Sequence, residues 1–352
     1  MRLVLALAAG LILTVLVAAG VTLAVLRIQS PTNPQQVNLR SGFTISEESA
    51  IVQATAKARP AVVSVVTQQQ TSPLVRGSGY LATSDGFIVT NINVIANATG
   101  MTVLVAGDSK PHEARLVDYD CQTGVAVIKI DKVSGLPTLA FADPTALVQG
   151  QLIVALSGPV DGGAITPGYV SAMHRVVSIG DPVTSARTIQ FSDTIQTSAT
   201  IDGGTSGGPL LNVGGQVIGI AMESPDVRTG FGLNVADIQD DVQQILQSGQ
   251  VTVSSLGAGT TVVSSEASTL SGLPQGSLIV SEDPGGPAAI AGLQAGDVIT
   301  QVDDVHLDSA HPLSLVLRSR FHANQRVTVS YTRSGASTQA ELTLTGVHPT
   351  CP

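Results

Sequence analysis

The 352-residue chain contains no tryptophan, and aromatic residues make up only 3% of it. Charged residues are also scarce: their 12% share is about half that of an average soluble protein. Acidic residues outnumber basic ones by 26 to 17, which gives a net charge of −9. Such a chain lacks the basic surface that nucleic-acid binding needs, so we expect no nucleic-acid partner. Its hydrophobic core must be built from Val, Ile, Leu and Ala.

Cysteine is nearly absent too, since the chain has only Cys121 and Cys351 and no C-x-x-C pair. This excludes the usual zinc-ribbon and thioredoxin-type sites. The acids Asp237, Asp240 and Asp241 fall at a predicted helix start, where the helix dipole favours them without a metal. We therefore expect neither a metal nor a cofactor. Whether the two cysteines pair in an oxidising compartment is left open by the sequence.

The N-terminus has no charge between Leu3 and Leu26. As a helix, these residues would span about 36 Å, enough to cross a hydrocarbon core of about 30 Å. The sequence therefore predicts a transmembrane anchor over residues 1–27, with the folded part outside the cytoplasm. A cleaved signal peptide is the alternative, because 18–20 offers small residues. Residues 28–46, rich in Pro, Asn, Gln and Ser, are predicted to be a flexible linker.

Residues 47–250 show the pattern of a mainly β domain. After a short helix that ends near Pro60, β-branched runs are separated by Gly, Asp, Pro or Asn. They lie at 61–66, 77–83, 87–91, 101–106, 125–130, 152–157, 194–199 and 217–222. This spacing favours a barrel or sandwich over βαβ units. An amphipathic pattern starting at Ile238 predicts a closing helix capped by Gly249.

A Gly-Thr-Ser-Gly-Gly-Pro motif at 204–209 is the candidate chemical centre. Flanking glycines can expose a serine hydroxyl and direct backbone N–H groups to one point, although a simple turn has the same composition. The surrounding segment 194–220 resembles the nucleophile region of the HtrA family of trypsin-like serine proteases. Stretches at 60–65, 77–91, 125–130, 167–173 and 230–235 resemble that family in the same order. The resemblance implies a trypsin-like double β-barrel.

The chain departs from this family at two of the three triad positions. The family places its general base in T-N-x-H-V, where this chain has Asn93, and its orienting acid in D-L-A-V, where this chain has Gly124. Only the nucleophile position, Ser206, is retained. An amide has no basic group to take the serine proton, so Ser206 is expected to be a poor nucleophile. The resemblance assigns the oxyanion-hole donors to the N–H groups of Gly204 and Ser206, with Asp202 adding an unfavourable carboxylate nearby.

Residues 252–347 resemble the PDZ domain of the same family, most clearly in the stretch PAAIAGLQAGDVI at 287–299. A strand at 277–284, a helix at 309–321 and a hairpin at 326–346 complete the predicted unit. The resemblance implies a peptide-binding loop at Leu256, Gly257 and Ala258, whose N–H groups would hold a C-terminal carboxylate. It also implies a pocket floor formed by Leu313, Val316 or Leu317, although these residues equally suit the core of a small domain.

Three hypotheses follow for the function. The first is a membrane-anchored pseudoprotease of the cell envelope that binds unfolded or C-terminal peptide segments, or regulates an active relative; family analogy suggests a trimer. The second is an active serine endopeptidase that uses an unrecognised base. In this hypothesis Asp118 and Asp120, which lie just before Gly124, could reach the acid position, but they would have no histidine to orient. In the third, the barrel domain is a spacer and the PDZ unit carries all function.

Overall fold

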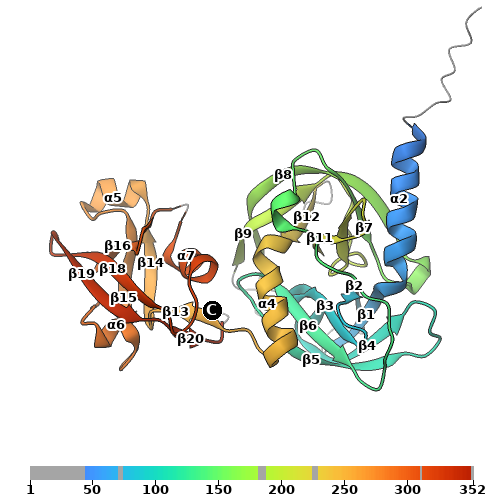
Figure 1. Ribbon diagram of the computed structural model, residues 1–352, viewed down its shortest axis with the longest axis horizontal. Coiled ribbons are helices and arrows are strands. Elements are labelled where there is room, and N and C mark those ends of the chain that lie inside the picture. The colour runs from blue at the N-terminus through green and yellow to red at the C-terminus, as the bar shows by residue number, and fades with distance from the viewer. Residues whose placement is uncertain (1–43, 70–73, 181–187, 224–228, 310, 350–352) are drawn as a thin grey trace, which may run out of the picture. The chain divides into compact units, whose positions relative to one another are not determined.

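The computed structural model describes residues 44–69, 74–180, 188–223, 229–309 and 311–349 (Figure 1). The predicted anchor at 1–27 lies outside these ranges, and within them no helix is long and apolar enough to span a membrane. The predicted linker was wrong at its end, because residues 44–46 already belong to α2 (Thr44–Ala58). Free of Pro and Gly, and followed by Glu47 and Glu48, they suit the first turn of a helix.

The first barrel is closed by six antiparallel strands in the order β1-β2-β3-β6-β5-β4. They are β1 (Val62–Gln69), β2 (Val75–Leu81), β3 (Phe87–Asn91), β4 (Ala98–Val105), β5 (His112–Tyr119) and β6 (Val125–Ile130). A single turn of helix, α3 (Ile92–Ile95), follows β3 directly. All six residues of β6 are buried, as expected for a strand that faces both the barrel interior and packed neighbours.

The second barrel repeats this closure with the order β10-β11-β12-β9-β8-β7. Its strands are β7 (Leu152–Leu156), β8 (Ile165–Gly180), β9 (Thr188–Thr197), β10 (Pro209–Asn212), β11 (Val217–Met222) and β12 (Gly230–Asn234). Helix α4 (Val235–Ser248) ends the domain and buries Ile238, Val242 and Ile245, the stripe predicted from its periodicity. Short 3-10 turns η1 (Arg59–Ala61), η2 (Pro144–Ala146) and η3 (Val160–Gly162) connect the longer elements.

The C-terminal part is a separate β-sheet with its own apolar core. Its sheet has the order β14-β15-β16-β18-β19, with β17 added beside β16, and a second pair joins β13 to β20. The strands are β13 (Val253–Ser255), β14 (Ala258–Val263), β15 (Gly276–Glu282), β16 (Val298–Val302), β17 (Val305–His306), β18 (Arg326–Arg333), β19 (Ala336–Thr343) and β20 (Thr345–Val347). Helices α5 (Ser265–Ser271), α6 (Pro287–Ile290) and α7 (Leu313–Arg320) complete it.

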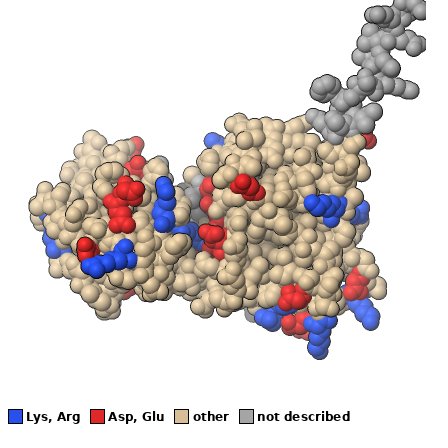
Figure 2. Space-filling view, in the orientation of Figure 1, with Lys and Arg blue, Asp and Glu red and all other residues tan. Residues whose placement is uncertain are grey.

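The mainly β double barrel followed by a PDZ-type sheet is therefore confirmed. The strand predicted at 217–222 agrees with β11 to the residue, whereas β5, β10 and β12 were not predicted as strands. Figure 2 shows the consequence of the low charge content, since uncharged residues cover most of the visible surface. The interiors are built from aliphatic side chains, as the absence of tryptophan requires.

Candidate active-site cleft

Ser206 lies in the turn that leads into β10 and is only 3% exposed. Its N–H donates to the carbonyl of Asp202 at 2.9 Å, so this predicted oxyanion donor is engaged within its own turn. The Asp202 carboxylate fixes the turn from the other side by accepting the N–H of Thr205 at 2.8 Å. The Gly204 carbonyl accepts the Ser78 hydroxyl at 2.6 Å. This conformation therefore does not present the Ser206 N–H to a substrate oxygen.

The partner of the Ser206 hydroxyl is Asn91, at the end of β3. Asn91 Nδ2 donates to Ser206 Oγ and to the carbonyl of Ala221, both at 2.9 Å. Its Oδ1 accepts the N–H of Val94 at 3.1 Å, which caps the N-terminus of α3. The amide oxygen is therefore committed to the helix cap, and its nitrogen faces the serine. A group that donates to Oγ cannot remove the serine proton.

The predicted base position, Asn93, lies two residues further on, in α3, and is half-buried. The structure brings its helix next to the loop of the predicted acid position, because the N–H of Ile92 donates to the Gly124 carbonyl at 2.8 Å. The three predicted triad positions thus come from adjoining segments. Sequence reasoning nevertheless missed Asn91, the residue that contacts the serine and caps α3.

Gly124 has a φ of +77°, in the left-handed region that side chains disfavour. A Cβ at this position would come within 2.6 Å of Cε1 of Phe191, whose side chain is 3% exposed. The phenyl ring therefore lies directly against the position that a side chain at residue 124 would need. Loss of the acid is accompanied by filling of its space with an apolar ring. No sequence signal identified Phe191, which is distant from Gly124 in the chain.

The nearby acids do not replace the missing one. Asp118 accepts the N–H of Val251 at 2.7 Å, and Asp120, fully buried, accepts the N–H of Gln122 at 2.7 Å. The second oxygen of Asp120 pairs with the guanidinium of Arg318 in α7. The idea that either acid serves the empty position at Gly124 therefore loses support, because both carboxylates already have other partners.

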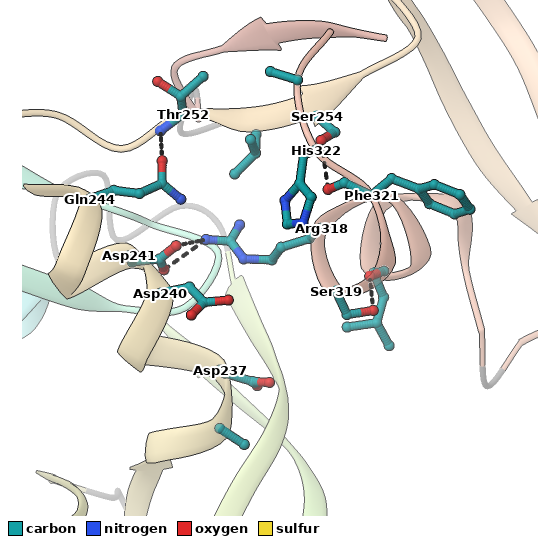
Figure 3. A pocket seen from close by; sticks show the side chains of 14 residues that line it. Asp237, Asp240, Asp241, Gln244, Thr252, Ser254, Arg318, Ser319, Phe321 and His322 are labelled. Carbon is teal, nitrogen blue, oxygen red and sulfur yellow. Dashed lines mark hydrogen bonds and ion pairs between the residues drawn. The ribbon is translucent and has the colours of Figure 1, made fainter. Parts of the chain in front are cut away.

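Arg318 also pairs with Asp241 of α4 at 2.8 Å (Figure 3). One guanidinium therefore contacts two buried carboxylates, Asp120 and Asp241. Arg318 and Asp241 border a cavity of about 330 Å³, whose α4 side carries Asp237, Asp240 and Asp241. Burial raises the pKa of Asp241 to about 6 despite its pairing with Arg318. Burial, with Asp193 and Asp241 nearby, raises the pKa of Asp237 to about 7. This cavity was not anticipated from the sequence.

Four of the six histidines pair with carboxylates. These pairs are His112 with Asp108, His174 with Asp193, His311 with Asp308 and His348 with Asp118. Across the described ranges, the hydrogen bonds of the Ser206 hydroxyl come from Asn91 and, at 3.4 Å, from the N–H of Glu223, and none involves a histidine. A base hidden elsewhere in the chain therefore finds no support in this geometry.

The predicted peptide-binding residues lie around one groove of the PDZ-type unit. Leu256, Ala258, Leu313 and Leu317 line it, whereas Val316 faces the apolar core. The N–H of Gly257 donates to the Ser255 hydroxyl at 2.9 Å. The pocket-lining and core interpretations of the helix leucines both apply, because Leu313 and Leu317 are about as buried as the core residue Val316.

Cys121 lies in the same loop as Gly124 and is 2% exposed. It takes part in a disulfide. Cys351, the second cysteine of the chain, lies outside the described residues.

Two closed barrels with a Gly-Thr-Ser-Gly turn at one end of β10, followed by a PDZ-type sheet, define a trypsin-fold protein joined to a PDZ domain. Residues 77–220 match the trypsin-like peptidase domain family, and residues 278–330 match the PDZ domain family. The serine protease Do-like HtrA of Lactococcus lactis subsp. lactis is 33% identical over 290 residues, which cover 76% of this chain and 70% of that protein. The chain belongs to the HtrA family.

Other relatives extend the comparison. A probable periplasmic serine endoprotease, DegP-like, from Halomonas elongata is 37% identical over 275 residues, covering 72% of this chain and 56% of the relative. This chain spans about half the length of the DegP-like relatives. The solved HtrA-type protease AlgW with a decapeptide superposes with a TM-score of 0.69 at 25% identity, covering 85% of this chain and 99% of that one. A serine endoprotease from Yersinia pestis gives 0.62 at 26% identity, covering 84% and 98%.

Replacing Gly124 with alanine should destabilise the fold by about 3 kcal/mol, from left-handed backbone strain together with the contact against the Phe191 ring. Gly135 is the matched control: its φ is +68°, but an added Cβ would meet nothing within 4 Å. Gly135→Ala should therefore cost only about 1 kcal/mol. Urea denaturation of both variants measures the difference. Equal losses would contradict the proposed close packing of Phe191 on Gly124.

Asn91→Ala should lower the free energy of unfolding by about 2 kcal/mol, because it removes the cap of α3 and the buried hydrogen bonds that Asn91 donates to the Ala221 carbonyl and the Ser206 hydroxyl. Asn93→Ala, at the half-buried neighbouring position, should cost about 0.5 kcal/mol or less. Denaturation of the two variants side by side tests the assignment. A larger loss for Asn93→Ala would reverse the roles assigned to the two residues.

Asp237→Asn should stabilise the protein at pH 8 by about 1 kcal/mol and have little effect at pH 5. The pKa of Asp237 is raised to about 7 in the folded state, so the folded protein binds this proton more tightly than the unfolded chain. Stability from this group is therefore present at low pH and is lost as the pH rises toward and through 7. Thermal unfolding between pH 5 and 8 measures it; a steeper loss of stability with pH in Asp237→Asn would show that the sign is wrong.

Proposed function

We propose that this chain is an HtrA-family pseudoprotease of the cell envelope, which binds peptide segments without cleaving them. The main observation behind this proposal is that Ser206 Oγ accepts a hydrogen bond from Asn91 Nδ2, with Asn93 and Gly124 at the base and acid positions. Two further features support it: the Ser206 N–H is bonded to Asp202, and the Phe191 ring occupies the space beside Gly124. Each feature opposes a different requirement of serine catalysis.

The binding half of the proposal comes from the relatives. AlgW has been solved with a decapeptide and with a tripeptide, and DegP-like relatives are described as periplasmic. The groove lined by Leu256, Ala258, Leu313 and Leu317 gives this chain an apolar surface for such a segment. Anchoring through residues 1–27 and assembly as a trimer, by family analogy, belong to the same proposal.

The decisive measurement is fluorophosphonate labelling together with casein cleavage, for the natural protein and for Ser206→Ala. We expect both proteins to be equally silent, because the described groups that hydrogen-bond to Oγ, Asn91 Nδ2 and the N–H of Glu223, both donate to it and cannot take its proton. The Lactococcus lactis relative serves as the positive control for the assay. Labelling of the natural protein that Ser206→Ala abolishes would overturn the proposal and establish the rival, an active endopeptidase with an unrecognised base.

Rebuilding the triad distinguishes a site that only lacks its catalytic groups from a site that is also sterically blocked by Phe191. Asn93→His with Gly124→Asp should stay inactive and be destabilised, because a carboxylate side chain introduced at position 124 would meet the Phe191 ring. Adding Phe191→Ala should recover stability relative to that double variant. Casein cleavage and urea denaturation report the two effects. Activity in the double variant alone would show that Phe191 does not block the acid position.

Binding is tested separately with the natural chain and reduced, carboxymethylated α-lactalbumin, a permanently unfolded protein. We expect a stable complex that native α-lactalbumin does not form. A Leu317→Glu variant places a charge in the PDZ groove and tests the third hypothesis. If the PDZ unit carries all function, this variant loses all binding; retained binding would indicate a contribution from the barrel domain.

A further inference from the structure

Residues 347–349 form part of the wall of the groove assigned to peptide binding. Val347, His348 and Pro349 line this groove, which has a volume of about 260 Å³, together with Leu256 and Leu313. Pro349 is buried, whereas Val347 and His348 are exposed. Pro349 is therefore the residue of this segment that is packed most closely against its surroundings.

Two features place the segment there. β20 pairs with β13, with Val347 opposite Val253 and Thr345 opposite Ser255. β13 ends immediately before Leu256, the first residue of the predicted carboxylate loop. The pairing therefore carries the chain past the same loop that a bound peptide end would approach, and His348 and Pro349, which follow β20, line the groove.

The segment is also held by a side-chain contact. His348 Nε2 lies 2.9 Å from Oδ1 and 3.1 Å from Oδ2 of Asp118. Asp118 is itself fixed, because its side chain is only 12% exposed and accepts the N–H of Val251 at 2.7 Å. Cys121, three residues further along the chain, is held by a disulfide. His348 therefore binds to a rigid point outside the groove.

One N–H group of the carboxylate loop is already hydrogen-bonded within the protein. The N–H of Gly257, one of the predicted donors, is satisfied by the Ser255 hydroxyl. A peptide carboxylate that uses this N–H would have to replace the bond to Ser255. An incoming ligand therefore gains new contacts only after existing ones are broken.

We propose that residues 347–349 are a resident blocker of the PDZ groove, and that a peptide ligand must displace Pro349 and separate His348 from Asp118 before it binds. This inference rests on the proposed peptide-binding function. A tethered segment competes at an effective concentration in the millimolar range. A blocker with an intrinsic dissociation constant of about 0.1 mM would therefore weaken a free peptide about 10-fold.

The test uses the full chain and the double variant His348→Ala/Pro349→Asp, which removes the contact with Asp118 and puts a charge into the apolar groove. His306→Ala is the matched control, because His306 is an exposed histidine of the same unit in β17, outside the residues that line the groove. The probe is a fluorescein-labelled decapeptide with a free carboxylate that copies residues 340–349. Its anisotropy is measured in non-reducing buffer, so that the disulfide of Cys121 is intact in all three proteins.

We expect the double variant to bind the probe at least about 10-fold more tightly than the natural protein, with His306→Ala unchanged. Equal affinity in all three proteins would overturn the blocking inference and leave peptide binding intact. Failure of all three to bind would overturn peptide binding by the groove, and the blocking inference with it.

Hydrogen exchange of the unliganded natural protein gives a readout that needs no ligand. The amides of Gly346, Val347 and His348 should be protected, and protection of His348 should fall in the double variant. Fast exchange of His348 in the natural protein would overturn the blocker even if the peptide binds, so the two proposals can fail separately.

Discussion

The amide of Asn91 is the contact on which the arrangement of the cleft depends. It lies at the end of β3 in the first barrel and donates to Ser206 and Ala221, which belong to the second. Its oxygen fixes the start of α3, so all polar atoms of the side chain are engaged. Because Asn91 is 2% exposed, breaking this contact would remove buried hydrogen bonds that join the two barrels. One side chain thus joins the barrels and sets the environment of the serine.

This contact sets the direction of the hydrogen bonds around Ser206. In a serine protease, the hydroxyl donates to a base and the backbone donors await an oxyanion. Here the hydroxyl oxygen accepts from an amide, and the Ser206 N–H is already bonded to Asp202. The acid position has become apolar, with Gly124 against Phe191. These differences support one another, because an isolated carboxylate beside Phe191 would be buried without a histidine to pair with.

The sequence predicted the parts of this protein that depend on local pattern. The runs of β6 and β11, the buried stripe of α4 and the departures at Asn93 and Gly124 were all readable from residue order. Asn91 as the partner of Ser206, and Phe191 against Gly124, were not. Both are contacts between segments far apart in the chain, and they depend on how the barrels close. The strand β5 was missed because its charged residues interrupt the hydrophobic alternation.

Because the chain has few charged residues, each ion pair accounts for a larger part of its ionic contacts. Arg318 of α7 serves Asp120 and Asp241 together, and Asp120 in turn orders the loop that carries Gly124 by accepting the Gln122 N–H. Breaking this cluster would leave two buried carboxylates without a counter-ion, which costs more than the loss of a surface ion pair. Arg318 also lines the PDZ groove, so one guanidinium contacts both the wall of this groove and the loop that carries Gly124. The position of this loop and the shape of the groove therefore depend on the same ionic cluster.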